Sequence, residues 1–137
     1  MKFLRAYFRD EGGATAVEFA MISGAFLIML FGIIEVGRIF WTWNALQYAT
    51  EETARYAIVH TAASSSDLSD YAFQAMSGIN TDVSASSLTV LTSSPTVAGV
   101  SFVQVDSSYV FSTLTSFLPD SISSLTLTAS ARVPIVP

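Results

Sequence analysis

The chain has 137 residues, a formal net charge of −5 and no cysteine. Charged residues make up only 12% of it and hydrophobic residues 51%, whereas an ordinary soluble domain has about 25% charged residues. This composition favours one small domain with a membrane segment, and it excludes disulfides, cysteine lipidation and thiolate metal sites. The acidic balance argues against nucleic acid as a partner.

The first elements are a basic leader, residues 1–13, and an uncharged apolar run, Phe19–Ile34. Counted from Ala14, the apolar stretch measures roughly 31 Å as a helix, and a hydrocarbon core is about 30 Å thick. A cleaved secretory signal fits poorly, because no small-x-small site follows the apolar run. We therefore expect a retained transmembrane helix over residues 14–38.

Charge predicts the orientation of this helix. The leader has a net charge of +1, whereas residues 39–137 have a net charge of −5. Basic flanks stay in the cytoplasm. We expect a single-pass protein of a bacterial inner membrane, with its N-terminus cytoplasmic, its C-terminal domain periplasmic, and membrane lipid as one partner.

Residues 39–63 predict an amphipathic extension of the same helix. Apolar or small side chains recur at spacings of three and four, which is the helical period. They are Ile39, Trp43, Leu46, Ala49, Thr53 and Ala57, and the polar face contains Thr42, Asn44, Gln47, Glu51, Glu52 and Arg55. The serine run 64–66 indicates where this helix stops.

Residues 64–137 predict a small α+β domain. A short helix is expected over 67–76, and strands over 87–92, 100–111 and 124–133. In the last strand the alternating apolar residues are expected to share one face; they are Leu125, Leu127, Ala129, Ala131 and Val133. The fold class is then α+β and pilin-like: a long N-terminal α-helix packed on a small antiparallel β-sheet.

One motif indicates function. Gly13-Ala14-Thr15-Ala16-Val17-Glu18-Phe19 places a small residue before a helix, a glutamate five residues later and then an aromatic. This resembles the cleavage site of type IV prepilins. The resemblance implies that a prepilin peptidase cuts between Gly13 and Ala14, and that Glu18 and Phe19 belong to the processing and assembly motif. Glu18 would then neutralise the new ammonium of Ala14; the alternative is a Glu18 at headgroup level without a partner.

The wider pattern resembles the TadE-like family over residues 11 to about 60. The motif continues with Glu35-Val36-Gly37-Arg38 and later Ala54-Arg55-Tyr56-Ala57. The resemblance implies a pilin-like component of the tight-adherence (Flp) pilus machinery, without catalytic activity, cofactor or small-molecule substrate. Its implied partners are the peptidase, other pilin-like subunits (TadF-like proteins and the major Flp pilin) and an inner-membrane assembly platform. The extra domain favours a minor over a major pilin.

Four further residues are candidates for docking a partner helix. Glu35 and Arg38 are three apart on one helix face and close to Gly37, and Arg55 occupies a family position. The plainer alternatives are an interfacial pair that ends the span and a solvated charge at Arg55.

Two other functions remain open. One is a bitopic membrane anchor with a periplasmic recognition domain, indifferent to Gly13 and Glu18. The other is an envelope enzyme with a serine nucleophile, for which His60 is the only imidazole base. A histidine near a helix end more often faces solvent or binds helix carbonyls, and one histidine without cysteine argues against a histidine-ligated metal cluster within the chain.

Overall fold

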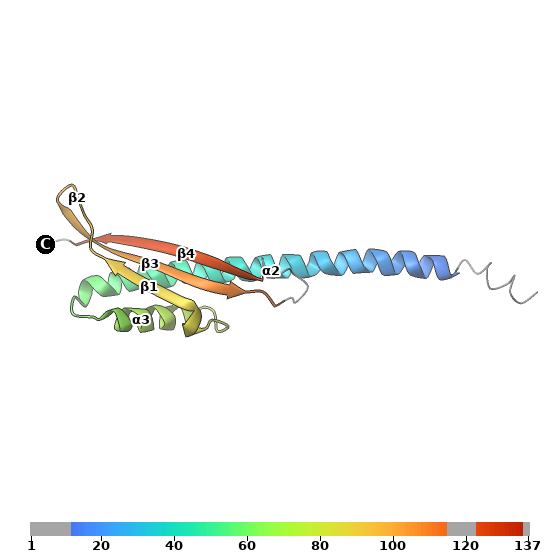
Figure 1. Cartoon of the computed structure of the whole chain (residues 1–137), viewed down its shortest axis with the longest axis horizontal. Helices are drawn as coiled ribbons and strands as arrows, with labels where there is room; N and C mark the ends of the chain where they lie inside the picture. The colour runs from blue at the N-terminus through green and yellow to red at the C-terminus, as the bar shows by residue number, and fades with distance from the viewer. Residues whose placement is uncertain (1–11, 115–122, 136–137) are drawn as a thin grey trace, which may run out of the picture. The chain divides into compact units, whose positions relative to one another are not determined.

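The computed structural model describes residues 12–114 and 123–135. Its elements run in the order α2 (Gly12–Val59), α3 (Ser65–Ser77), η1 (Ala85–Ser87), β1 (Leu88–Ser93), β2 (Thr96–Val97), β3 (Val100–Ser112) and β4 (Ser124–Pro134) (Figure 1). The long helix and the small antiparallel sheet confirm the predicted α+β class. The chain divides into two compact units at Val36 and Gly37, and α2 contributes to both.

The described part of the first unit is the apolar portion of α2. An 18-residue stretch of this helix has a mean hydropathy of 2.2, and none of it is buried within the chain. Phe19 is 71% exposed, Ile28 76% and Phe31 50%. A helix that is apolar on all sides belongs in lipid or among other helices, so this portion is long and apolar enough to be a membrane anchor.

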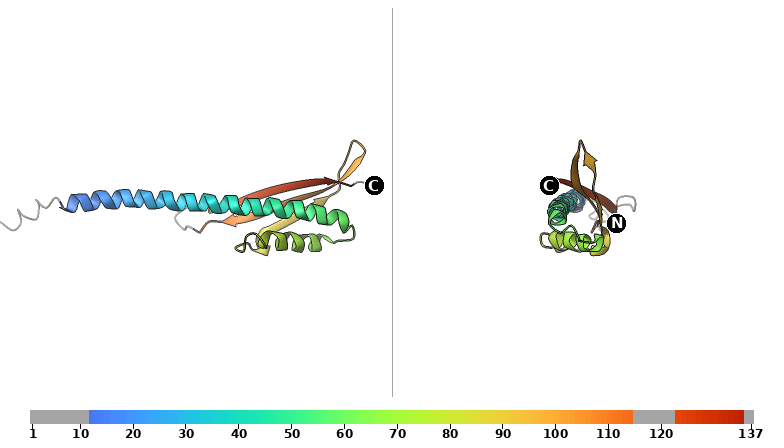
Figure 2. Two further views of the ribbon diagram at one scale, coloured as in Figure 1. Left: turned by 180° about the vertical axis from the view of Figure 1, so that it is seen from behind. Right: turned by 90° about the vertical axis from the view of Figure 1, so that its left-hand side faces the viewer.

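The second unit contains an antiparallel sheet with β3 at its centre. β1 pairs with β3 from Leu88 opposite Tyr109 to Ser93 opposite Gln104, and β4 pairs with the other side of β3. Figure 2 shows α3 running beside the last part of α2, with the strands to one side of both helices. The two edges of the main sheet are thus β1 and β4.

The core lies between the sheet and residues 37–59 of α2. Leu46 and Val105 are fully buried, and Met76 of α3 closes one end. The helix contributes mostly small side chains to this contact, and they are Ala45, Ala49, Thr50, Thr53 and Ala54. Both threonine hydroxyls donate 2.7 Å hydrogen bonds to the carbonyl four residues earlier, so their burial leaves no unpaired hydroxyl.

The helix boundaries differ from the predicted ones. α2 begins at Gly12 and ends at Val59 rather than spanning 14–63. The serine run begins α3 instead of ending α2: Ser64 and Asp67 form a reciprocal capping box. The Ser64 hydroxyl accepts from the Asp67 amide at 3.3 Å, and the Asp67 carboxylate accepts from the Ser64 amide at 2.9 Å. Such a box satisfies two amide donors that a helix start otherwise leaves open.

Two predicted faces were partly wrong. Thr42 was placed on the polar face but is buried, and its hydroxyl accepts a 3.0 Å hydrogen bond from the Asn80 side chain. Leu125 follows the alternation of β4, yet it is 46% exposed because it pairs with Phe111 near the end of the ladder. The sequence also missed β2, which forms a hairpin with β3 through Ala98 and Gly99, both at positive φ.

Candidate functional site

The motif around Gly13 lies in the first turns of α2. Gly13 and Ala14 are both helical, and no atom lies within 4 Å of where a Cβ on Gly13 would be. Glycine inside a helix is less stable than alanine by about 1 kcal/mol. Two adjacent glycines, Gly12 and Gly13, therefore make the start of α2 less stable than alanines would.

Glu18 and Phe19 are exposed side chains of the apolar portion of α2. The structure does not bring Glu18 together with another charged group by any hydrogen bond or ion pair found among the described residues. A carboxylate in such a segment is costly in lipid and is a functional candidate by default.

In the Glu35–Arg38 segment, Glu35 is buried and Arg38 is half-buried. Glu35 is only 8% exposed. The guanidinium carbon of Arg38 lies 5.0 Å from the centre of the Phe111 ring on β3, a cation–π contact that sequence reasoning missed. Gly37 has open space at its Cβ position. Arg38 therefore has a role within the second unit besides any role in docking.

Arg55 is exposed on α2 and makes no ion pair or hydrogen bond within the described parts of the chain. The structure does not bring it together with Gly37 or Arg38: on an α-helix, eighteen residues correspond to roughly 27 Å. Its role in docking, like that of Glu35 and Gly37, stays a prediction.

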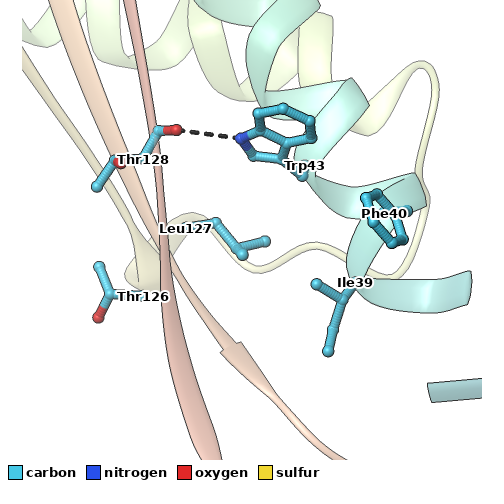
Figure 3. A pocket seen from close by; sticks show the side chains of 6 residues that line it. All are labelled: Ile39, Phe40, Trp43, Thr126, Leu127 and Thr128. Carbon is cyan, nitrogen blue, oxygen red and sulfur yellow. Dashed lines mark hydrogen bonds between the residues drawn. The ribbon is translucent and has the colours of Figure 1, made fainter. Parts of the chain in front are cut away.

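A cavity of about 340 Å³ lies between α2 and the edge strand β4 (Figure 3). Ile39, Phe40 and Trp43 line it from the helix, and residues 126–128 line it from β4. The indole Nε1–H of Trp43 donates a 3.2 Å hydrogen bond to the Thr128 carbonyl. Within the described parts of the chain, no titratable side chain lines this cavity.

His60 follows the last turn of α2, as expected. Its ring stacks on Tyr56 with centroids 3.9 Å apart, and its Nδ1 lies 3.2 Å from the Tyr56 carbonyl. Tyr56 also stacks on Tyr71 of α3, at 4.2 Å. The cavity beside His60 is lined by no serine, and the hydroxyl of Ser64 is engaged in the capping box. The structure thus places His60 against the Tyr56 ring and a helix carbonyl.

No group of three histidine, cysteine, aspartate or glutamate side chains that could hold a metal ion occurs in residues 12–114 and 123–135. One polar cluster lies on the sheet: Arg132 donates to Gln104, whose amide in turn donates to Asp106.

Together these features define a class: an α+β protein whose single long helix starts as an unburied apolar segment and continues as one wall of a sheet-containing domain. Within this class, residues 13–55 match the model of the family described as TadE-like protein. The match confirms the resemblance predicted from the motifs, and it suggests involvement in Tad/Flp pilus systems as a structural component. No curated protein and no solved structure gives a significant match.

Proposed function

We propose that this chain is a minor pilin or pseudopilin of a tight-adherence pilus system. A prepilin peptidase removes residues 1–13, and the apolar portion of α2 then packs against the helices of other pilin-like subunits. The observation that carries the proposal is the TadE-like match over residues 13–55, because it spans both the cleavage motif and the start of the sheet-packed helix.

The exposed apolar surface supports this role. Large hydrophobic side chains cover the helix before Gly37, and the chain itself buries none of the most apolar stretch. Such a surface is stable only in lipid or against other apolar helices. A subunit that moves from membrane to filament exchanges the first environment for the second.

Cleavage and assembly are linked through one pair of charges. Hydrolysis after Gly13 creates an ammonium on Ala14, and Glu18 lies four residues further along the helix. One helical turn separates the two groups, so the Glu18 carboxylate reaches the ammonium of its own chain or of a neighbour. In a low-dielectric setting an unpaired charge is costly, so a pair formed with the ammonium of a neighbouring subunit favours the assembled state.

Orientation and partners follow from the same scheme. The basic leader stays in the cytoplasm, and the domain built from residues 37–137 lies in the periplasm or on the pilus. Its partners are the peptidase, TadF-like and Flp pilin subunits, the inner-membrane platform and lipid. Adhesion or secretion is then a property of the assembly, and this chain has no catalytic role in it.

The test is the intact mass of the protein from membranes of its own host, with and without the prepilin peptidase. We expect residues 1–13 to be lost only when the peptidase is present. Gly13→Val should block this loss, while Gly24→Val is the matched control, because both glycines have open space around the Cβ position. An uncleaved chain in both strains would leave the unprocessed bitopic anchor as the better account.

A second variant separates processing from assembly. Glu18→Gln keeps the size of the side chain but removes its charge, so it should be cleaved normally and yet fail to enter sheared pili. Normal recovery of Glu18→Gln in pili would contradict the charge pairing while leaving the cleavage scheme intact.

A further inference from the structure

A stripe of aromatic and acidic side chains runs along the face of α2 that meets α3. Tyr48, Glu52, Tyr56 and His60 follow one another at intervals of four residues, which places them on one helix face. Tyr71 of α3 meets this stripe: its ring stacks on Tyr56, and its hydroxyl donates a long 3.5 Å hydrogen bond to Glu52. The stripe is therefore built by two helices.

A cavity of about 340 Å³ lies at the N-terminal end of the stripe, beside Tyr48 and Glu52. Tyr48, Glu52 and Tyr71 line it together with residues of the end of α3, which are Gln74, Ala75, Gly78 and Ile79. Tyr56 covers one face of the Tyr71 ring, so the ring meets the cavity with its other face or its edge. Tyr48 is 52% exposed, which leaves its ring accessible from solvent.

The charged side chain that lines this cavity is the acidic Glu52. Glu52 is half-buried and forms no ion pair within the described residues. Among the described residues, no lysine, arginine or histidine lines the cavity. Burial and the nearby Glu52 carboxylate raise the pKa of Tyr71, so the tyrosine stays neutral at physiological pH and its O–H remains a hydrogen-bond donor. Aromatic faces beside a carboxylate that has no cationic partner form an arrangement that binds organic cations.

We propose that the cavity lined by Tyr48, Glu52 and Tyr71 binds a lysine or arginine side chain of a partner protein. The aliphatic stem of such a side chain packs against the rings and Ile79, while its charge reaches Glu52. The cavity volume is ample for one such side chain. Residues 37–137 carry seven acidic residues against three arginines, so the domain as a whole attracts a basic partner.

A lipid headgroup of the same membrane is the less suitable occupant. Glu52 lies fifteen residues beyond Gly37, roughly 22 Å along the helix, and this comparison rests on the membrane placement proposed above. Binding of the cation does not depend on that placement. Failure of leader cleavage and failure of cation binding are therefore separate results.

The test is a titration of the full chain in nanodiscs of phosphatidylglycerol, with ring-¹³C tyrosine as the NMR label. N-acetyl-lysine methylamide and the arginine analogue are the probes, and N-acetyl-norleucine methylamide is the neutral control. Tyr48 and Tyr71 resonances should shift and saturate in the millimolar range, while buried Tyr109 should not move. Glu52→Gln should weaken binding about fivefold, whereas Glu51→Gln, of the same charge and exposed, should change it less than twofold.

Three results with these probes would overturn the proposal. They are the absence of a saturable shift, equal binding of the norleucine control, and equal effects of the two glutamate variants. A free diamine such as cadaverine that binds ten times more tightly than the lysine probe would point to a polyamine and not to a partner protein. Tyr48→Leu, which removes an exposed ring without touching the core, should lower affinity for both cationic probes.

Discussion

Leu46→Ala tests whether residues 37–59 of α2 and the sheet form one cooperative unit. Leu46 is fully buried in the cluster that also contains Met76, Tyr109 and Phe111. The substitution removes three carbon atoms, worth about 2.4 kcal/mol at 0.8 kcal/mol for each buried group. Adding the cost of a partly unfilled cavity, we expect a loss of about 3 to 4 kcal/mol in the free energy of unfolding.

This loss is large beside the stability of the domain. A unit of about 100 residues has a free energy of unfolding of roughly 5–15 kcal/mol, and 1 kcal/mol lowers its Tm by about 4–8 °C. Urea and thermal unfolding of the full chain in nanodiscs, followed by tryptophan fluorescence and near-ultraviolet circular dichroism, measure the change. The midpoint should fall by more than 12 °C.

The matched control is Leu91→Ala on β1. It deletes the same atoms from a side chain that is 65% exposed, so it should cost less than about 1 kcal/mol. The packing argument is refuted if Leu46→Ala lowers the free energy of unfolding no more than Leu91→Ala does. The packing of α2 on the sheet would then not contribute to the stability of the domain.

Two further predictions concern single contacts, and a third concerns the orientation of the chain in the membrane. Trp43→Phe should lose about 1 kcal/mol with its hydrogen bond to β4, while Trp41→Phe, which is exposed, should lose almost nothing in the same unfolding assay. Hydrogen bonds from the side chain and backbone of Ser64 lower the pKa of Asp67 below 3.8. Their stabilisation is therefore present above pH 3.8 and lost as the pH falls through the folded-state pKa, and Asp67→Asn should remove this part of the acid sensitivity of α3 measured by hydrogen exchange. Thr61→Cys, the only thiol in that variant, should react with a membrane-impermeant maleimide in spheroplasts; reaction only after lysis would contradict the periplasmic placement.

Local pattern predicted most of the fold. The alternation in β4 placed Leu127, Ala129 and Ala131 on the buried face, where they lie. The buried stripe of α2 was less well predicted, because Thr42 and Thr50 are polar. Their burial depends on an Asn80 amide 38 residues away and on a bond to the helix backbone, and neither is visible in a hydropathy pattern.

The candidate sites divide in the same way. The motif from Gly13 to Phe19 is local, so its resemblance to a prepilin cleavage site can be seen in the sequence; the cleavage itself and the role of Glu18 stay predictions. The cation cavity was missed because Glu52 lies on the face of the helix predicted to be polar, and because Tyr71, which completes the cavity, comes from α3. The one available signal was the spacing of four that separates Tyr48, Glu52 and Tyr56 in the sequence.

The last prediction rests on a difference in side-chain size between the two parts of α2. Large side chains cover the portion before Gly37, whereas alanine and threonine side chains of residues 37–59 are buried within the second unit. Ala49 is 1% exposed, so Ala49→Leu forces three extra carbon atoms into a filled contact and should cost about 1–3 kcal/mol.

Ala25→Leu is its control, because Ala25 is exposed on the apolar portion and gains only surface suited to lipid. Unfolding of the second unit should be unaffected by Ala25→Leu and clearly destabilised by Ala49→Leu. Equal unfolding midpoints for the two variants would mean that the residues around Ala49 leave room for a larger side chain. The small residues of the TadE-like segment would then need a reason outside the chain, such as a close-packed neighbouring subunit.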